Sequence, residues 1–510
     1  MIKRLLHPLL YREDGIAMAM ALGIMAIFSI AAVSVMTIAD NNRARVRRDA
    51  KLSLSYQAAE AGTNAYLSDL TESNVFYNSY LAKGEATRTD SSNATHASSN
   101  SSDVAWSSGT TWTYKTAAAS DTGWYSLGNG YQYLIYIYPP NSSVSGVGGQ
   151  ISRIDVIGRP AGSTDQSTWK TLETLTRPSA LTDFQAFTAT SVTYASTATT
   201  TGPIFVGHDK NGTLGTLTHD GTAKSNLYAE GTVGGSTTYQ NGARKYDSTT
   251  TPTALCKLNN CASIDFSQFA STITTVQGAA NAGGISLPST DTWTGTSTAF
   301  TPDAWKLVFN SNGTVTATSC KKYTTGSGQN ITTYNVWEGS NAPTCNTSKN
   351  APWSSAINVP SNGAIYSPLP VIVMGTVKGR VTIATAGDAV FGGNLSYNTP
   401  GTDVAGVETQ GTMWVASWGR VANGTETVNA AVLALNGGLQ AESSPPSCSN
   451  CKFVINGSIA VYGASGGAIQ LSQAFSTRTY NYDNNLLFVQ PPYWPTLGNS
   501  FDILVQREVG

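Results

Sequence analysis

The stretch that decides the fold is IAMAMALGIMAIFSIAAVSVMTIA, residues Ile16 to Ala39. It contains no charged side chain and no proline. At a rise of about 1.5 Å per residue, a helix of this length crosses a hydrocarbon core of about 30 Å. A buried helix of a soluble protein would normally keep a polar stripe, which this segment lacks. The stretch therefore predicts a transmembrane helix.

The helix is expected to continue beyond the apolar segment. Residues Asp40 to Leu70 (DNNRARVRRDAKLSLSYQAAEAGTNAYLSDL) contain no proline and keep a discontinuous apolar face. Gly62 is the one weak point in this stretch. A cleaved secretory signal is the alternative, but its shorter apolar region would not lead into such a helix. We therefore predict one uninterrupted helix over residues 16–70.

The order of segments around this helix carries a family resemblance. A short basic leader ends in Gly15, the apolar segment begins at Ile16, and an Arg-rich stretch leads to the motif AAEAG, which comprises Ala58, Ala59, Glu60, Ala61 and Gly62. This order resembles the PilX-like minor pilins and pseudopilins of type IV pilus and type II secretion machines. If Gly15 ends the leader, the fifth mature residue is Met20, where typical prepilins have glutamate.

The resemblance has consequences for processing and assembly. It implies that the leader is removed between Gly15 and Ile16 and that the precursor resides in the inner membrane. It also implies that the helix later packs against other pilin or pseudopilin subunits in a filament or its tip complex. Membrane lipid and these subunits are therefore the expected partners.

The charges on either side of the apolar segment leave its orientation open. The C-terminal flank is the more basic, with Arg43, Arg45, Arg47, Arg48 and Lys51. The positive-inside rule alone would then keep the body of the protein in the cytoplasm. The cysteines and the hydroxyl-rich composition indicate the opposite. We expect a protein of the cytoplasmic membrane whose body is exported to the cell surface or to a pilus.

All six cysteines lie in the second half of the chain, at Cys256, Cys261, Cys320, Cys345, Cys448 and Cys451. The even number and the local spacing predict three disulfides in an oxidising compartment. Zinc is the competing interpretation, because Cys448 and Cys451 have C-x-x-C spacing. No histidine is near them, and no βαβ context supports a thioredoxin-like redox role. Neither a metal nor a cofactor is expected.

The composition favours an extracellular β-rich protein. Charged residues make up only 12% of the chain, about half of the usual share, and small hydroxyl and amide residues replace them. The net charge of −1 gives no excess of Lys and Arg for phosphate, so nucleic acid is not an expected partner. A surface glycan or host ligand fits such a body better.

Local patterns divide the chain into successive units and predict an α+β fold. The expected units are a leader (1–15), the helix (16–70), a polar connector (71–123), an antiparallel β meander (124–178) and a β-rich ectodomain (186–510). The meander is built from three β-prone runs, Tyr131 to Tyr138, Ile151 to Ile157 and Trp169 to Thr176.

The ectodomain consists of short strands separated by Gly or Asn. GTVKGRVTIATAGDAVFGGNLSY (Gly375 to Tyr397) is typical of successive rungs that bury their apolar residues only by stacking. A parallel β-helix or solenoid is the favoured fold, with a β-sandwich as the alternative. The aromatic and proline-rich ending, Tyr482 to Val509, is expected to cap the last open rung.

Few residues offer catalytic chemistry. His208 and His219 each precede an Asp; they could form a metal or acid/base site, or simply occupy tight turns. A carbohydrate-active β-helix enzyme is the enzymatic alternative, but the acids near the rungs have no repeating offset: Asp388, Asp403, Glu408 and Glu426, with only Arg380 and Arg420 nearby. We therefore expect a non-enzymatic structural or adhesive protein, or a surface anchor that enters no filament.

Overall fold

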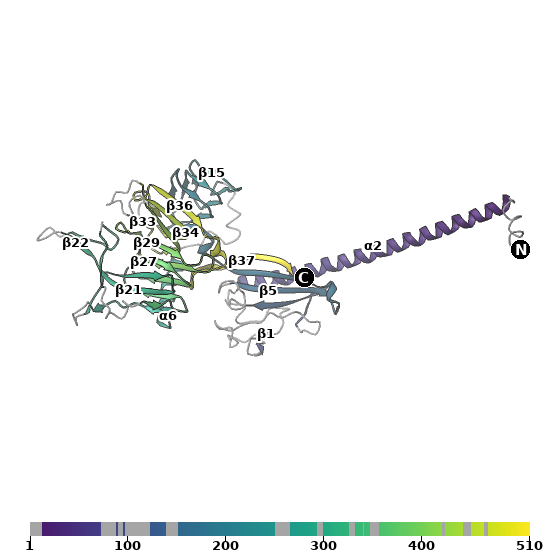
Figure 1. The fold of residues 1–510 in the computed structure, drawn as a ribbon, viewed down its shortest axis with the longest axis horizontal. Helices are drawn as coiled ribbons and strands as arrows, with labels where there is room; N and C mark the ends of the chain where they lie inside the picture. Colours follow the sequence, from purple (N-terminus) through teal and green to yellow (C-terminus); the bar gives the residue numbers. More distant parts are fainter. Residues whose placement is uncertain are drawn as a thin grey trace.

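The structure, a computed structural model, describes residues 13–72, 88–89, 95–96, 123–138, 151–249, 266–292, 299–325, 332–339, 341–346, 356–420, 424–441, 450–463 and 468–509. In these ranges a long N-terminal helix leads into a mainly β body (Figure 1). Most of the expected leader and of the expected polar connector lies outside the described residues.

Helix α2 spans Glu13–Glu72, 60 residues without a break. The prediction of one continuous helix through residue 70 is therefore confirmed. No proline occurs in this range, so no backbone N–H is missing from the helical hydrogen bonds. In Figure 1 the N-terminal half of α2 projects away from the rest of the molecule as a bare rod.

A small antiparallel sheet packs on the C-terminal part of α2. Its strands, in spatial order, are β3 (Tyr125–Ser126), β4 (Tyr131–Tyr138), β5 (Ser152–Pro160), β6 (Lys170–Ala180) and β37 (Thr496–Val509). The three strands expected from the sequence are β4, β5 and β6. The apolar core between helix and sheet includes Tyr66 and Leu70 from α2 and Ile135, Ile154 and Val156 from the sheet.

The last strand corrects one expectation. The sequence predicts a C-terminal segment that caps the last open rung, but β37 pairs antiparallel with β6, from Val509 opposite Thr171 to Thr496 opposite Ala180. The chain from residue 181 to residue 495 is therefore inserted between two neighbouring strands of the small sheet. The body therefore begins after β6 and ends before β37, and these two strands lie side by side in the small sheet.

The first parallel ladder of the body contains the following strands in spatial order: β17 (Ile285–Ser286), β26 (Ala364–Ser367), β28 (Arg380–Thr385), β30 (Val404–Thr409), β32 (Thr425–Ala434), β34 (Lys452–Val461), β7 (Ala186–Thr188), β10 (Ile204–Val206), β13 (Leu227–Ala229) and β16 (Lys245–Tyr246). Aliphatic residues stand opposite one another along it, including Ile365, Ile383, Val407 and Val432. Because these side chains all point to the same side of the ladder, its inner face is continuously apolar.

Two further sets of parallel strands run beside the first ladder. The second comprises β20 (Ala304–Asn310), β27 (Val371–Val377), β29 (Ala389–Tyr397), β31 (Met413–Val415), β33 (Leu439–Ala441) and β35 (Ile469–Gln470). It also includes a separate parallel sheet of β8 (Val192–Tyr194), β11 (Leu217–His219) and β14 (Val233–Gly234). The third joins the end of β29 and the starts of β32 and β34 to β36 (Thr477–Tyr482), β9 (Thr199–Thr200), β12 (Thr222–Ala223) and β15 (Thr238–Tyr239). Inward residues of all three sets form one apolar cluster.

Strand order along the first ladder does not follow chain order. The chain enters in the middle of the ladder at β7 and proceeds through β10 and β13 to β16 at one end. It continues from β17 at the other end and returns through β34, which pairs with β7. The beginning and the end of the body therefore close on each other, with Ile459 opposite Ala186.

The outer face of the first ladder is covered. Helix α6 (Thr272–Asn281), the turn η4 (Phe266–Phe269) and the turn η5 (Asn484–Leu487) with the chain after it contribute to a second apolar cluster. Antiparallel strands decorate the body: β21 (Thr314–Lys321) pairs with β20, β24 (Thr344–Cys345) and β25 (Ile357–Asn358). Smaller hairpins are β1 (Arg88–Thr89) with β2 (Thr95–His96), β18 (Asp291–Thr292) with β19 (Ala299–Phe300), and β22 (Tyr323–Thr325) with β23 (Thr332–Tyr334).

Polar side chains also stack from strand to strand. Asn429, Asn456 and Asn481 stand opposite one another in β32, β34 and β36. Asn456 donates its amide to Oδ1 of Asn429 (2.7 Å), and Asn481 donates to Oδ1 of Asn456 (2.8 Å). This asparagine ladder locks the register of the three strands, because a shift by one residue would break both hydrogen bonds.

Candidate functional site

The N-terminal part of α2 exposes apolar side chains on all sides. An 18-residue window within Met18–Thr71 reaches a mean hydropathy of 2.3, and none of that window is buried. The polar exceptions are satisfied within the helix: the hydroxyls of Ser29, Ser34 and Thr37 donate to the carbonyls four residues earlier. By length and composition, this part of α2 could span a membrane and so serve as an anchor. Gly15 and Ile16, the expected processing site, both lie within α2.

The AAEAG motif lies where α2 meets the small sheet. Ala58 and Ala59 are buried, and Glu60 is only partly exposed. A Cβ on Gly62 would approach Tyr133 Cδ2 to 2.7 Å and Val156 Cγ1 to 2.8 Å. The small residues of the motif therefore let the helix lie close against β4 and β5.

The matching position on the sheet is Gly158 of β5, where a Cβ would collide with the backbone of α2 at Ser55 and Ala59. This glycine is not among the residues that the sequence analysis predicts to be functional. The Ser55 side chain, on the same part of α2, donates a buried hydrogen bond to the carbonyl of Thr168 (2.8 Å). A glycine inside an otherwise alternating strand often marks the close approach of another backbone. The glycine in ISRIDVIGRP is therefore the sequence signal that indicates this contact. The helix and the sheet are thus fitted to each other by glycines on both sides.

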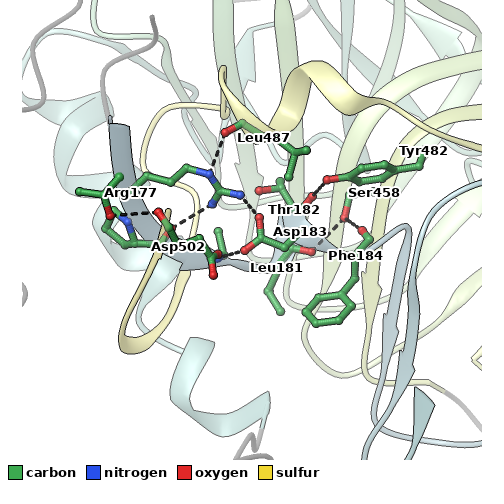
Figure 2. A network of polar contacts seen from close by, with 12 residues as sticks. Arg177, Leu181, Thr182, Asp183, Phe184, Ser458, Tyr482, Leu487 and Asp502 are labelled. Atoms are coloured by element: carbon green, nitrogen blue, oxygen red, sulfur yellow. Dashed lines mark hydrogen bonds and ion pairs between the residues drawn. The ribbon is translucent and has the colours of Figure 1, made fainter. Parts of the chain in front are cut away.

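A buried arginine joins the body to the small sheet. Arg177, near the end of β6, is 1% exposed. It donates to the carbonyl of Leu487 (2.8 Å) and forms an ion pair with Asp183, as Figure 2 shows. It also donates to the carbonyl of Pro178 (2.9 Å). Burial lowers the pKa of Arg177. One side chain therefore ties the outgoing strand to the η5 turn, which precedes the returning strand.

Two hydroxyls in the same network bind the entry segment to the body. Ser458 of β34 donates to the carbonyl of Phe184 (2.7 Å), and Tyr482 of β36 donates to the carbonyl of Thr182 (2.8 Å) (Figure 2). Asp183 also accepts a hydrogen bond from the Ala180 N–H (2.7 Å). The junction is consequently a network of directional contacts rather than a bare linker.

Among the described residues, two glutamates have a strongly raised pKa, and they face opposite sides of the β wall. Glu408 stands opposite Ala384 and Leu433, both on the covered outer face. Burial raises the pKa of Glu408 to about 8. The nearby Thr272 hydroxyl lowers this pKa in part, but it donates its hydrogen bond to the carbonyl of Phe269 (2.9 Å). Among the described residues, neither carboxylate oxygen of Glu408 has a hydrogen-bond partner.

Glu426 lies inside the body instead. It stands opposite Phe453, a member of the inner cluster, and beyond Phe453 stands Arg478. Burial raises the pKa of Glu426 to about 8, although the charge of Arg420 lowers it. The wall of the ladder therefore separates Glu426 from Glu408, and these two carboxylates do not converge on one groove.

The two expected histidines have different partners. His208 contacts Glu230 (Nδ1 to Oε2, 2.7 Å), and the adjacent Asp209 accepts backbone hydrogen bonds within a turn. His219 is fully buried, lies 3.1 Å from the Thr200 hydroxyl and stacks on Tyr194. Burial lowers the pKa of His219. No group of three or more His, Cys, Asp or Glu residues suited to a metal occurs in the described ranges.

Of the six cysteines, Cys320 and Cys345 form a disulfide between β21 and β24. Cys451 is also disulfide-bonded. Cys256, Cys261 and Cys448 lie outside the described residues, so the remaining pairing stays a prediction.

Comparison with known proteins gives little further guidance. No protein-family model and no curated protein sequence matches the chain. Among solved structures, the chain is similar to the competence-associated pilin ComZ from Thermus thermophilus, with 12% identity, coverage of 90% of this chain and 97% of that chain, and a TM-score of 0.29. At that TM-score the likeness establishes no common fold.

Proposed function

We propose that this protein is a structural, minor-pilin-like component of a type IV pilus or related filament that displays its body at the cell surface. The observation that carries the proposal is the bare apolar half of α2, continuous with a half that is docked on a sheet. Apolar surface on this scale is stable only when lipid or other helices cover it. We propose that membrane lipid covers this apolar surface first and that neighbouring pilin helices cover it after assembly.

We further infer that the parallel ladders wind as one β-solenoid and that this solenoid has an adhesive role. The stacked register of inner aliphatic residues and the asparagine ladder support a solenoid. The double connection through β6 and β37 supports display under load, because two strands rather than one linker hold the body to the helix.

A non-enzymatic role is part of the proposal. Hydrolysis of a glycosidic bond needs two carboxyl groups that flank the same bond, roughly 5–10 Å apart. The separation of Glu408 and Glu426 by the wall of the ladder argues against that arrangement. Asp403, another acid of the region, is engaged with the backbone N–H groups of Gly379 and Thr399.

A second candidate is a surface protein that stays in the membrane and never enters a filament. Met20 favours it, because a prepilin processed after Gly15 would carry glutamate at this position to pair with a neighbouring N-terminus. N-terminal sequencing of the exported form separates the two: a chain that begins at Ile16 and occurs in sheared filaments supports the filament component. An intact leader and confinement to the membrane fraction support the plain anchor.

The anchor itself is tested with a matched pair of substitutions in α2. Val33 is 63% exposed and Val46 is 66% exposed, but only Val33 lies in the apolar segment. A lysine near the centre of a membrane span costs about 3 kcal/mol of insertion free energy. Val33→Lys should therefore reduce the membrane-bound fraction strongly, and Val46→Lys, beside the arginines, should not. Equal fractionation of both variants would contradict an anchor in this segment.

A further inference from the structure

A cavity of about 630 Å³ opens at one corner of the body. The turn between β27 and β28 forms one wall with Lys378 and Arg380, and the turn before β26 forms another with Ser361. Pro492, from the chain that returns to the small sheet, closes a third side. The volume is within the range of about 300–1,000 Å³ that small-molecule sites occupy.

The shape of the cavity depends on a tight turn. Gly379 has a φ of +94°, a conformation that side chains other than glycine rarely adopt, and a Cβ there would meet no atom within 4 Å. Its N–H donates to Oδ1 of Asp403 (2.8 Å), and Oδ2 of Asp403 accepts from the Thr399 N–H (2.6 Å). The Asp403 carboxylate thus stabilises the turn at Gly379. Because both of its oxygens accept backbone hydrogen bonds, this carboxylate is already engaged.

The two cations in the cavity wall, Lys378 and Arg380, have no carboxylate partner among the described residues. Neither Lys378 nor Arg380 forms an ion pair or a side-chain hydrogen bond in the part of the chain that the structure describes. Lys378 is exposed, whereas Arg380 is partly buried, and burial lowers the pKa of Arg380. A partly buried guanidinium without a partner is unfavourable, and an anion from outside would relieve that cost.

We propose that this cavity binds the carboxylate of an acidic sugar, with Arg380 making the bidentate contact and Lys378 and Ser361 completing the site. The planar guanidinium matches a carboxylate in two parallel hydrogen bonds, and the ammonium adds a point charge. The proline ring offers an apolar surface to the sugar ring, and the Ser361 hydroxyl can bond to its hydroxyls.

A polyanion such as nucleic acid is the less suitable occupant. Phosphate chains are bound by extended rows of Lys and Arg. Here two cations stand beside small and apolar residues, in a protein with a net charge of −1. The inference deepens the proposed adhesive role by naming a ligand class. The binding measurement below requires no filament or membrane, so its failure would be distinct from a failure of the anchor.

The test is calorimetric titration of the full chain in detergent with galacturonate, with galactose as the matched neutral sugar and inorganic phosphate as the bare anion. Galacturonate should bind at least tenfold more tightly than galactose, a difference of about 1.4 kcal/mol. Arg380→Gln should weaken galacturonate binding about tenfold, and Arg380→Lys should restore it only in part, because lysine cannot make the bidentate contact.

Lys378→Glu tests for a loss of binding that does not come from misfolding, because Lys378 is an exposed turn residue. It should abolish galacturonate binding while the thermal midpoint stays unchanged. Lys452→Gln, an exposed lysine elsewhere on the body, is the control and should bind as the wild type does. Equal affinity for galactose and galacturonate, tighter binding of phosphate than of galacturonate, or wild-type binding by Lys378→Glu would each overturn the proposal.

Discussion

Gly158 of β5 lies directly against the backbone of α2 at Ser55. A Cβ built on Gly158 would come within 1.8 Å of the Ser55 carbonyl oxygen and within 2.8 Å of the Ala59 nitrogen. Both are backbone atoms of a regular helix, so neither can move alone. The distance between helix and sheet is therefore set by the missing side chain at this position.

Gly158→Ala should push the helix away from the sheet. Overpacking of this kind costs about 1–3 kcal/mol of the free energy of unfolding, and rigid backbone on one side favours the upper end. Guanidinium denaturation of the full chain in detergent measures the effect. Gly234→Ala is the matched control, because a Cβ at Gly234 would meet no atom within 4 Å. If both variants unfold at the wild-type midpoint, the close contact is not a determinant of stability.

Arg177→Met should loosen the junction between the small sheet and the body. The substitution removes the ion pair with Asp183 and leaves the carbonyl of Leu487 without its donor. Loss of one partner from a buried pair costs about 3–5 kcal/mol. The same change at Arg507, whose side chain is 64% exposed, should cost less, because the buried Glu173 keeps its ion pair with Arg153 (2.9 Å).

Limited proteolysis distinguishes the two arginine variants. Cleavage between the end of β6 and β7 should accelerate in Arg177→Met and stay near the wild-type rate in Arg507→Met. Comparable acceleration in both would mean that general destabilisation, and not the junction network, governs access to this segment.

Asn456→Ala should destabilise the body about twice as much as Asn481→Ala. Asn456 takes part in two side-chain hydrogen bonds of the asparagine ladder, whereas Asn481 takes part in one. A hydrogen bond of this kind contributes about 1 kcal/mol to stability. Thermal unfolding of both single variants provides the comparison. Equal losses would show that the ladder is not the source of the stabilisation.

Glu408 should make the protein less stable as the pH rises from about 4.5 to about 8. Its pKa is raised by burial from 4.5 to about 8, so in this window the unfolded chain has lost the proton that the folded chain keeps. The free energy of unfolding then falls by about 1.4 kcal/mol per pH unit from this residue alone, and the fall ends above pH 8.

Glu408→Gln removes that dependence. The difference in unfolding free energy between variant and wild type should be smallest near pH 4.5, grow through the window and level off above pH 8. Denaturation midpoints at several pH values supply the measurement. Glu426 keeps its own raised pKa in this variant, so part of the pH dependence should remain. A pH-independent difference would mean that Glu408 is not buried as a neutral acid.

The sequence by itself determined the features that depend on local patterns. Continuous apolarity from Ile16 to Ala39 and the absence of proline through Leu70 are enough to specify one long helix, because helical hydrogen bonds join residues only four apart. Alternating β-prone runs located β4, β5 and β6 in the same way. The expectation of a mainly β body likewise needed only the recurrence of short strands between glycines and asparagines.

Only the tertiary structure decided which distant segments meet. β37 pairs with β6, and β34 pairs with β7, although more than 250 residues separate the partners in each case. A β-strand has the same period of two whichever strand it pairs with, so its pattern carries no record of its partner. The aromatic ending therefore has the composition of a cap, although its strand pairs with β6. The roles of Gly158, Arg177 and the cavity at Arg380 likewise arise only when remote segments come together.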